Sequence, residues 1–126
     1  MFKQLKNFAI QCFVAILVSA PAFADMQLVI VGEQGCSWCD QWNEEISEIY
    51  PKTAEGKRAP LRRIDIHDTL PKDLSFSLGL NFTPTFVLVV HGVERGRIEG
   101  YPGEDFFWGL LAVLIDEADE VNATGG

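Results

Sequence analysis

Hydrophobic and polar positions alternate along the chain with two different periods. Residues 26–31 are an unbroken apolar run rich in β-branched side chains, which is typical of a buried strand. Apolar positions between residues 38 and 50 recur at helical spacing instead, with acidic residues between them. By the same criteria the sequence predicts strands at 26–31, 61–66, 85–90 and 97–101, and helices at 38–50, 71–78 and 104–120.

Proline and glycine residues mark the expected ends of these elements. Pro51 ends the first helix, and residues 52–59 are expected to form a polar connection. Gly79 stops the short second helix. Gly92 and Gly96 flank a turn, so that the last two strands form a hairpin. Residues 122–126 are expected to be a frayed tail.

The order strand, helix, strand, helix, strand, strand, helix predicts a single α/β domain. The first connections imply parallel strands joined by a right-handed crossover, and the hairpin adds an antiparallel pair. The expected architecture is a mixed four-stranded sheet with helices on both sides. A chain of 126 residues with 48% hydrophobic residues is long enough for one such core and too short for two ordinary domains.

The first 24 residues are typical of an export signal. Lys3 and Lys6 precede an apolar run at residues 8–18, Pro21 follows, and Ala22-Phe23-Ala24 has small residues where a signal peptidase cleaves. The sequence predicts cleavage before Asp25, a mature domain of residues 25–126 and a periplasmic location. An uncleaved anchor is the alternative, but spanning a bilayer takes about 20 apolar residues. No stable membrane insertion is therefore expected after cleavage.

Removal of the signal changes both the charge and the cysteine count. Loss of its two lysines takes the net charge from −8 to −10, which disfavours a nucleic-acid surface. Loss of Cys12 reduces three cysteines to one pair, Cys36 and Cys39. In an exported protein such a pair lies in a compartment where disulfides persist.

The pair Cys36-Ser37-Trp38-Cys39 lies where the first strand gives way to a helix. Unpaired N–H groups and the helix dipole stabilise a thiolate at the helix N-terminus, so the pKa of Cys36 is expected to fall below the free value of about 8.5. Cys39, one turn on, can attack a mixed disulfide formed on Cys36. The chemistry predicted is thiol–disulfide exchange without a bound cofactor.

Other interpretations of the pair remain open at this point. A structural disulfide would close a short loop and restrict the unfolded chain little. A metallochaperone for a soft ion would need further ligands, for which the mature chain offers His67, His91 and Met26. A non-catalytic adaptor would not need the cysteines at all.

The chain passes from a strand through Cys-x-x-Cys into a helix, and later carries Thr-Pro directly before a strand. This arrangement resembles the thioredoxin-like fold over about residues 26–117. Residues 81–86, Asn-Phe-Thr-Pro-Thr-Phe, resemble the cis-proline loop of that family. The resemblance implies that Pro84 packs beside the cysteines and that the backbone of Thr83 pairs with an extended substrate segment. It places Gly100 in a loop beside the same surface. Trp38, between the cysteines, is expected to be exposed and to contribute to substrate docking.

The sequence also departs from the best-known thioredoxins. Ser37-Trp38 replaces Gly-Pro between the cysteines, and Gly35 replaces a tryptophan. Ile30 occupies the position of the buried acid that accepts the proton of the second thiol. Glu33, Asp40 or water are the candidate substitutes.

A narrower resemblance is to small periplasmic thioredoxins of bacterial sulfur-oxidation systems. It implies a reductase whose partners are periplasmic proteins with cysteines, including sulfur carriers, and whose electrons come from a membrane thiol donor. Among the remaining aromatic residues, Trp42 and the run 106–108 are expected to pack in the core.

Overall fold

The computed structural model describes residues 25–124, so the expected signal at 1–24 lies outside the described residues. Their sheet has the order β2-β1-β3-β4, in which β1 pairs with β2 in parallel and with β3 antiparallel, and β3 pairs with β4 antiparallel. The strands are β1 (Met26–Gly32), β2 (Leu61–Asp65), β3 (Thr85–Val90) and β4 (Val93–Glu99). The predicted α/β fold with a mixed four-stranded sheet is confirmed.

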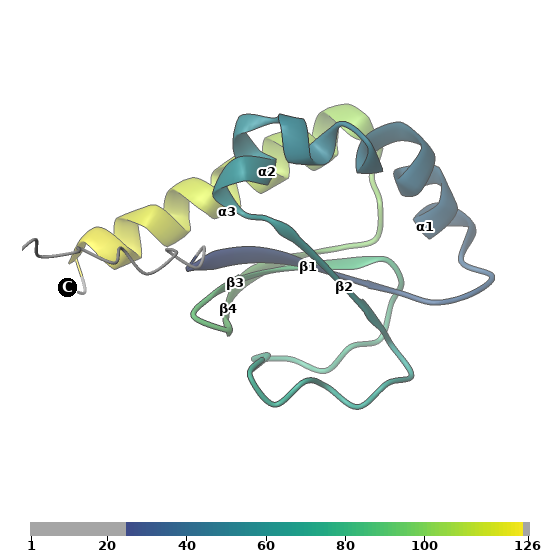
Figure 1. Ribbon diagram of the computed structural model, residues 1–126, viewed down its shortest axis with the longest axis horizontal. Helices are drawn as coiled ribbons and strands as arrows, with labels where there is room; N and C mark the ends of the chain where they lie inside the picture. The colour runs from purple at the N-terminus through teal and green to yellow at the C-terminus, as the bar shows by residue number, and fades with distance from the viewer. Residues whose placement is uncertain (1–24, 125–126) are drawn as a thin grey trace, which may run out of the picture.

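The helices gather on one face of this sheet (Figure 1). They are α1 (Ser37–Trp42), the π-helical η1 (Asn43–Ser47), the 3₁₀ turn η2 (Tyr50–Lys52), α2 (Ala54–Arg58) and α3 (Glu104–Thr124). The long loop between β2 and β3 covers the other face, so the expectation of helices on both sides of the sheet is corrected (Figure 1). Within residues 25–124, no helix combines the length and apolar character needed to cross a membrane.

The first predicted helix is interrupted and the connection after it is itself helical. Pro51 lies in the first turn of η2, where its fixed φ is tolerated, and the chain then turns into α2. Thr53 caps α2 by accepting a hydrogen bond from the Gly56 N–H at 3.0 Å. Gly56 packs directly on the carbonyl of Tyr50, which leaves no space for a Cβ atom. The polar connection expected at 52–59 is therefore corrected to a turn and a capped helix.

The second predicted helix, at residues 71–78, does not form. The backbone of Ser75 instead joins the hairpin, donating to Gly92 O at 2.8 Å and accepting from Glu94 N at 2.9 Å. The apolar side chains of the loop pack onto the second face of the sheet rather than along one helical stripe. That cluster contains Val29, Val31, Leu74, Val87 and Val89, with Ile64, Ile66, Leu70, Phe76 and Leu80 against it.

The turn of the hairpin is shorter than the positions of Gly92 and Gly96 predicted. Its turn is His91-Gly92, both with positive φ, and β4 begins at Val93 instead of residue 97. Gly96 lies inside β4 opposite Leu88, next to a β-bulge. A Cβ atom at Gly96 would collide with the side chain of Leu114, so this glycine permits close packing of α3. The expected turn at 92–96 is thus shortened to two residues.

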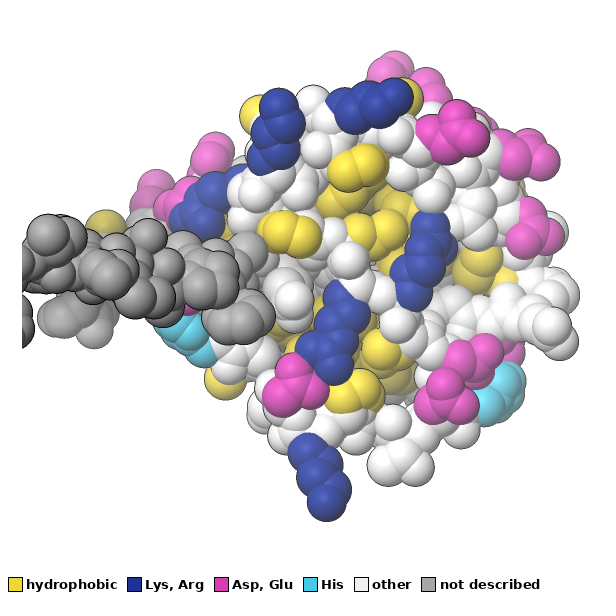
Figure 2. Space-filling model, viewed as in Figure 1, with side chains coloured by type: hydrophobic (Ala, Val, Ile, Leu, Met, Phe, Trp, Pro, Cys, Tyr) yellow, Lys and Arg dark blue, Asp and Glu magenta, His cyan; other side chains and the backbone are white. Residues whose placement is uncertain are grey.

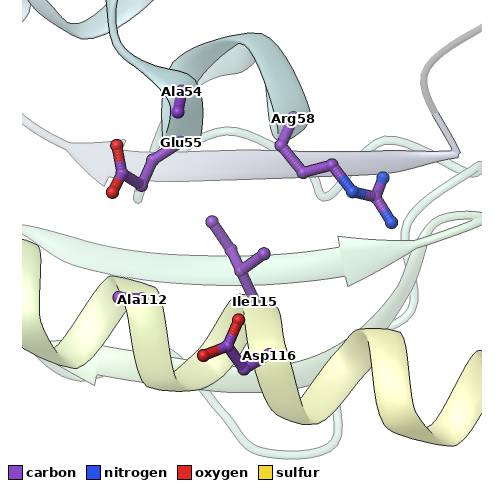
Figure 3. A pocket seen from close by; sticks show the side chains of 6 residues that line it. All are labelled: Ala54, Glu55, Arg58, Ala112, Ile115 and Asp116. Carbon is purple, nitrogen blue, oxygen red and sulfur yellow. The ribbon is translucent and has the colours of Figure 1, made fainter.

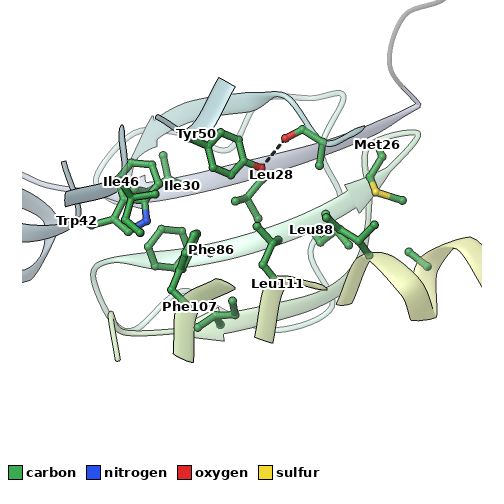
Figure 4. Close-up of a cluster of buried hydrophobic side chains, with 14 of the residues drawn as sticks. Met26, Leu28, Ile30, Trp42, Ile46, Tyr50, Phe86, Leu88, Phe107 and Leu111 are labelled. Atoms are coloured by element: carbon green, nitrogen blue, oxygen red, sulfur yellow. Dashed lines mark hydrogen bonds between the residues drawn. The ribbon is translucent and has the colours of Figure 1, made fainter. Parts of the chain in front are cut away.

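Aromatic side chains fill the core between the sheet and the helices (Figure 4). Trp42 is fully buried, as predicted, with ring centroids 5.4 Å from Phe86 and 5.9 Å from Phe107. The hydroxyl of Tyr50 donates to Ala59 O at 2.6 Å (Figure 4). Phe106 corrects the expectation for 106–108, because it is 71% exposed on the outer face of α3.

Strand β2 is an edge of the sheet and carries charged side chains. Arg62 forms a two-pronged ion pair with Asp73 of the loop, with distances of 2.6 and 3.0 Å. Figure 2 shows basic side chains interspersed with hydrophobic ones in the middle of the face in view, whereas acidic side chains lie mainly at its margin. Charges along an edge strand oppose pairing with another chain.

Candidate active site

Cys36 and Cys39 form a disulfide at the start of α1. Cys36 is the N-cap, with extended backbone at φ −85° and ψ 100°, and its Sγ accepts a hydrogen bond from the Cys39 N–H at 3.1 Å. The sulfur of Cys36 therefore already occupies the position of a capping oxygen. Only 8% of Cys36 and 6% of Cys39 is exposed.

The loop before β3 lies at the same end of the sheet. The Thr83–Pro84 peptide bond is cis, as the resemblance implied, and Pro84 is buried. Thr85 pairs with Val31, so this loop is level with the last residues of β1 that lead to the cysteines. The Gly100 N–H donates to Pro84 O at 2.7 Å. The fold thus gathers Thr83, Pro84 and Gly100 at the end of the sheet from which the chain leads to Cys36.

Glu33 ties the segment before Cys36 to two other loops. Its Oε1 accepts a hydrogen bond from Thr83 Oγ1 at 2.8 Å, and its Oε2 lies 2.8 Å from His67 Nε2. The hydrogen bonds from Thr83 and then His67 lower the pKa of Glu33. A carboxylate with a lowered pKa is a weaker base at neutral pH. The sequence identified Glu33 only as a candidate proton acceptor and missed this link.

A hollow of about 150 Å³ lies beside Cys39. Its lining consists of Ile30, Gly32, Glu33, Cys39, Asp40, Asn43, Arg63 and Ile64. A Cβ atom on Gly32 would lie 3.6 Å from Cys39 Sγ, so the glycine leaves that side of the sulfur uncovered. Ile30 belongs to the core, and the acids that line the hollow with it are Glu33 and Asp40. Because a water molecule needs only roughly 10–15 Å³ of such volume, the hollow has room for solvent at the second sulfur.

Arg63 is a hollow-lining residue that the sequence analysis missed. It stands opposite Ile30 in the register of β1 and β2. Its guanidinium donates to Asn43 Oδ1 at 2.9 Å and Ser47 Oγ at 2.8 Å, and lies 5.5 Å from the Trp42 ring centroid. The alternation of side chains along a strand, which separates Arg63 from Arg62, was the available signal.

Exposed aromatic side chains lie in the two segments that carry the predicted site. Trp38, between the cysteines, is 57% exposed, as expected, and Phe82, just before Thr83, is also 57% exposed. Phe82 and Thr83 line a second hollow of about 330 Å³ together with Glu99 and Gly100. Two residues predicted to bind substrate therefore share one surface depression.

The histidines that were candidate metal ligands lie apart. His67 contacts Glu33 near the disulfide, whereas the backbone of His91 bonds to Asp25 at the far end of β1. A strand of seven residues separates these ends by roughly 20 Å. Among residues 25–124, no three His, Cys, Asp or Glu side chains converge in an arrangement suited to a metal ion.

A third depression lies between α2 and α3, with lining residues from both helices (Figure 3). Its volume is about 310 Å³, and its lining is Ala54, Glu55, Arg58, Ala112, Ile115 and Asp116. Arg58 also pairs with Asp119 of α3. No cysteine or histidine is among the residues that line this depression, so its lining contains no group for thiol chemistry.

Comparison with known proteins agrees with this geometry. No protein-family model matches the chain. No curated protein matches it either. Among solved structures, the chain is similar to the periplasmic thioredoxin SoxS from Paracoccus pantotrophus in its reduced form, at 48% identity and a TM-score of 0.73. The match covers 74% of this chain and 98% of SoxS. The chain therefore belongs to the thioredoxin family and is a thiol–disulfide oxidoreductase.

Proposed function

We propose that this protein is an exported, periplasmic reductase that reduces disulfides or thiol adducts on cysteine-containing partner proteins. The observation that carries the proposal is the Cys36–Cys39 pair at the N-terminus of α1, next to the cis-proline loop. The similarity to a periplasmic thioredoxin supports both the chemistry and the location.

The reduced protein would act through two thiol–disulfide exchanges. The Cys36 thiolate, stabilised by the helix N-terminus, attacks a sulfur of the partner disulfide and expels one partner thiolate. Cys39 then loses its proton, attacks Cys36 Sγ, and releases the second partner thiol while the Cys36–Cys39 disulfide forms. Two electrons pass to the partner, and each departing thiolate takes a proton from solvent.

The residues around the disulfide supply the surface for that partner. Thr83 and Gly100 border the depression next to Pro84, where an extended segment bearing the target cysteine would lie. Trp38 offers an exposed apolar surface on the cysteine-bearing helix. Buried aromatic anchors commonly dominate such contacts.

The partners proposed are periplasmic proteins with reactive cysteines, including sulfur carriers of thiosulfate oxidation. A dithiol donor in the membrane would return the disulfide to the reduced state. The sulfur-oxidation role follows from the resemblance of the short exported chain, with its single Cys-x-x-Cys and Thr83-Pro84-Thr85-Phe86, to thioredoxins of those systems.

A Cys39→Ser variant tests the proposal, because it can form the mixed disulfide but cannot resolve it. Expressed with its signal in a bacterium that oxidises thiosulfate, it should accumulate adducts that dithiothreitol releases, visible on non-reducing gels and identifiable by mass spectrometry. Cys36→Ser is the matched control and should form none. Absence of adducts on Cys39→Ser, or full function of a variant lacking both cysteines, would contradict a reductase and favour an adaptor.

A further inference from the structure

We propose that Glu33 is a positioning residue that holds the cis-proline loop in the conformation that docks a protein substrate. The inference rests on the proposed function and adds to it a residue outside the thiol chemistry. Because Ile30 stands where the best-known thioredoxins have a buried acid, Glu33 was a candidate proton acceptor for Cys39. The proposal assigns Glu33 a different role.

The geometry of Glu33 is that of a clamp between loops. Thr83 and His67 lie 50 and 34 residues away along the chain, and each meets a different oxygen of the same carboxylate at 2.8 Å. Neither residue lies in a helix or strand, so the regular backbone hydrogen bonds of those elements do not hold these residues in place. Glu33 itself is three residues before Cys36. The clamp therefore fixes the position of the cis-proline loop relative to Cys36, the cysteine that attacks.

The same contacts make Glu33 a poor base for Cys39. Each carboxylate oxygen already has a partner, and the two hydrogen bonds lower the pKa of Glu33, although desolvation and, less strongly, the nearby Asp65 oppose this. The other charged groups around the hollow are Asp40 and Arg63. Since solvent has room beside the second sulfur, the proton of Cys39 can leave to water without a carboxylate.

A positioning role and a proton-acceptor role predict different kinetics. Loss of a docking contact raises KM for a partner held along the loop and leaves kcat unchanged. Loss of a base slows the resolving step for every disulfide. Reduction of a small disulfide such as 5,5′-dithiobis(2-nitrobenzoate) depends on the thiols and not on docking along the cis-proline loop. Reduction of insulin depends on the thiols and on docking along this loop.

The experiment compares Glu33→Ala, Glu33→Gln and the wild type in reduction of both disulfides. Dithiothreitol is the reductant for insulin, whereas the small disulfide is added to pre-reduced protein freed of dithiothreitol, so that its electrons come only from Cys36 and Cys39. Glu33→Ala should raise KM for insulin about two- to tenfold, the range expected for one net hydrogen bond. Its kcat and its rate with the small disulfide should stay within about twofold of wild type. Glu33→Gln should restore KM, because its amide oxygen can still accept from Thr83. Glu48→Ala, at an exposed position, controls for the loss of one negative charge and should match wild type.

A double-mutant cycle with Thr83→Val locates the effect. If the clamp acts through the Thr83 hydroxyl, Glu33→Ala should change KM little further in the Thr83→Val background. Additive effects, an unchanged KM in Glu33→Ala, or an equal loss of kcat on both disulfides in the Ala and Gln variants would overturn the inference. A wild-type protein that reduces neither disulfide would instead contradict the proposed function.

Discussion

Single carboxylates join segments around the disulfide that are distant in sequence. Glu33 holds Thr83, and Glu45 of η1 accepts a hydrogen bond from the Tyr101 hydroxyl at 2.7 Å. Tyr101 directly follows Gly100, so this second bond fixes the loop on the other side of Pro84. Neither acid could be assigned its partner from the sequence, because local patterns carry no information on contacts about 50 residues apart. Cys36 and Cys39 were identifiable because their chemistry needs only local spacing.

The Glu45–Tyr101 bond should make stability depend on pH. Hydrogen bonds from Tyr101 and then Gln41 lower the pKa of Glu45, so their contribution is present above the ordinary glutamate value of 4.5 and disappears as pH falls through the lowered folded value. Tyr101→Phe should therefore reduce the free energy of unfolding at pH 7, and the difference from wild type should shrink between about pH 5 and pH 3. Urea unfolding of both proteins at each pH measures this. A difference that is constant with pH would show that Glu45 is not involved.

The loop between β2 and β3 is the element that sequence patterns described least well. Its apolar residues resembled a short helix, yet they cover the second face of the sheet in irregular backbone held by the hairpin. Arg97 of β4 is central to this arrangement, donating to Gly79 O and Leu78 O at 2.9 Å each and pairing with Glu94. The side chains of Arg97 and Glu94 are only 8% and 5% exposed. These tertiary hydrogen bonds stabilise the irregular backbone more than the weak intrinsic helix preference of so short a segment stabilises a helix.

Replacement of Arg97 should loosen this loop. Arg97→Met keeps much of the apolar stem but leaves Glu94 and two carbonyls without their partner, which should lower the free energy of unfolding by about 2–4 kcal/mol. Hydrogen exchange should rise at residues 75–80 more than in β1 or β3. Arg95→Met, at an exposed position in the same strand, is the control and should change stability by less than about 0.5 kcal/mol. Equal effects of the two substitutions would contradict a specific role for Arg97.

At the scale of the whole molecule, the catalytic end and the start of the domain are opposite each other. Asp25 precedes the beginning of β1, and the cysteines follow its end (Figure 1). Cleavage before Asp25 would therefore leave the new N-terminus far from the disulfide. This arrangement suits a domain released from an export signal, because the processed end does not obstruct the site.

Export should be directly observable. Expressed in a Gram-negative host, the chain is expected in the periplasmic fraction with an N-terminal sequence beginning Asp25-Met26-Gln27. Replacement of Lys3 and Lys6 by glutamate should reduce export, because the positive charge of the signal orients its insertion. Edman sequencing and intact mass measure the cleavage site. A full-length chain retained in the membrane fraction would support the anchored alternative.

The sequence by itself determined the succession of four strands along the chain, the α/β class with a mixed sheet, and the location of the thiols at the start of a helix. These follow from hydrophobic period and from local spacing, which a chain carries wherever it folds. Only the tertiary structure decided that a loop rather than a helix covers the second face, that Glu33 and Arg63 line the hollow beside Cys39, and that Tyr101 bonds to Glu45. Those features depend on hydrogen bonds between distant segments, which form only once the sheet has set their register.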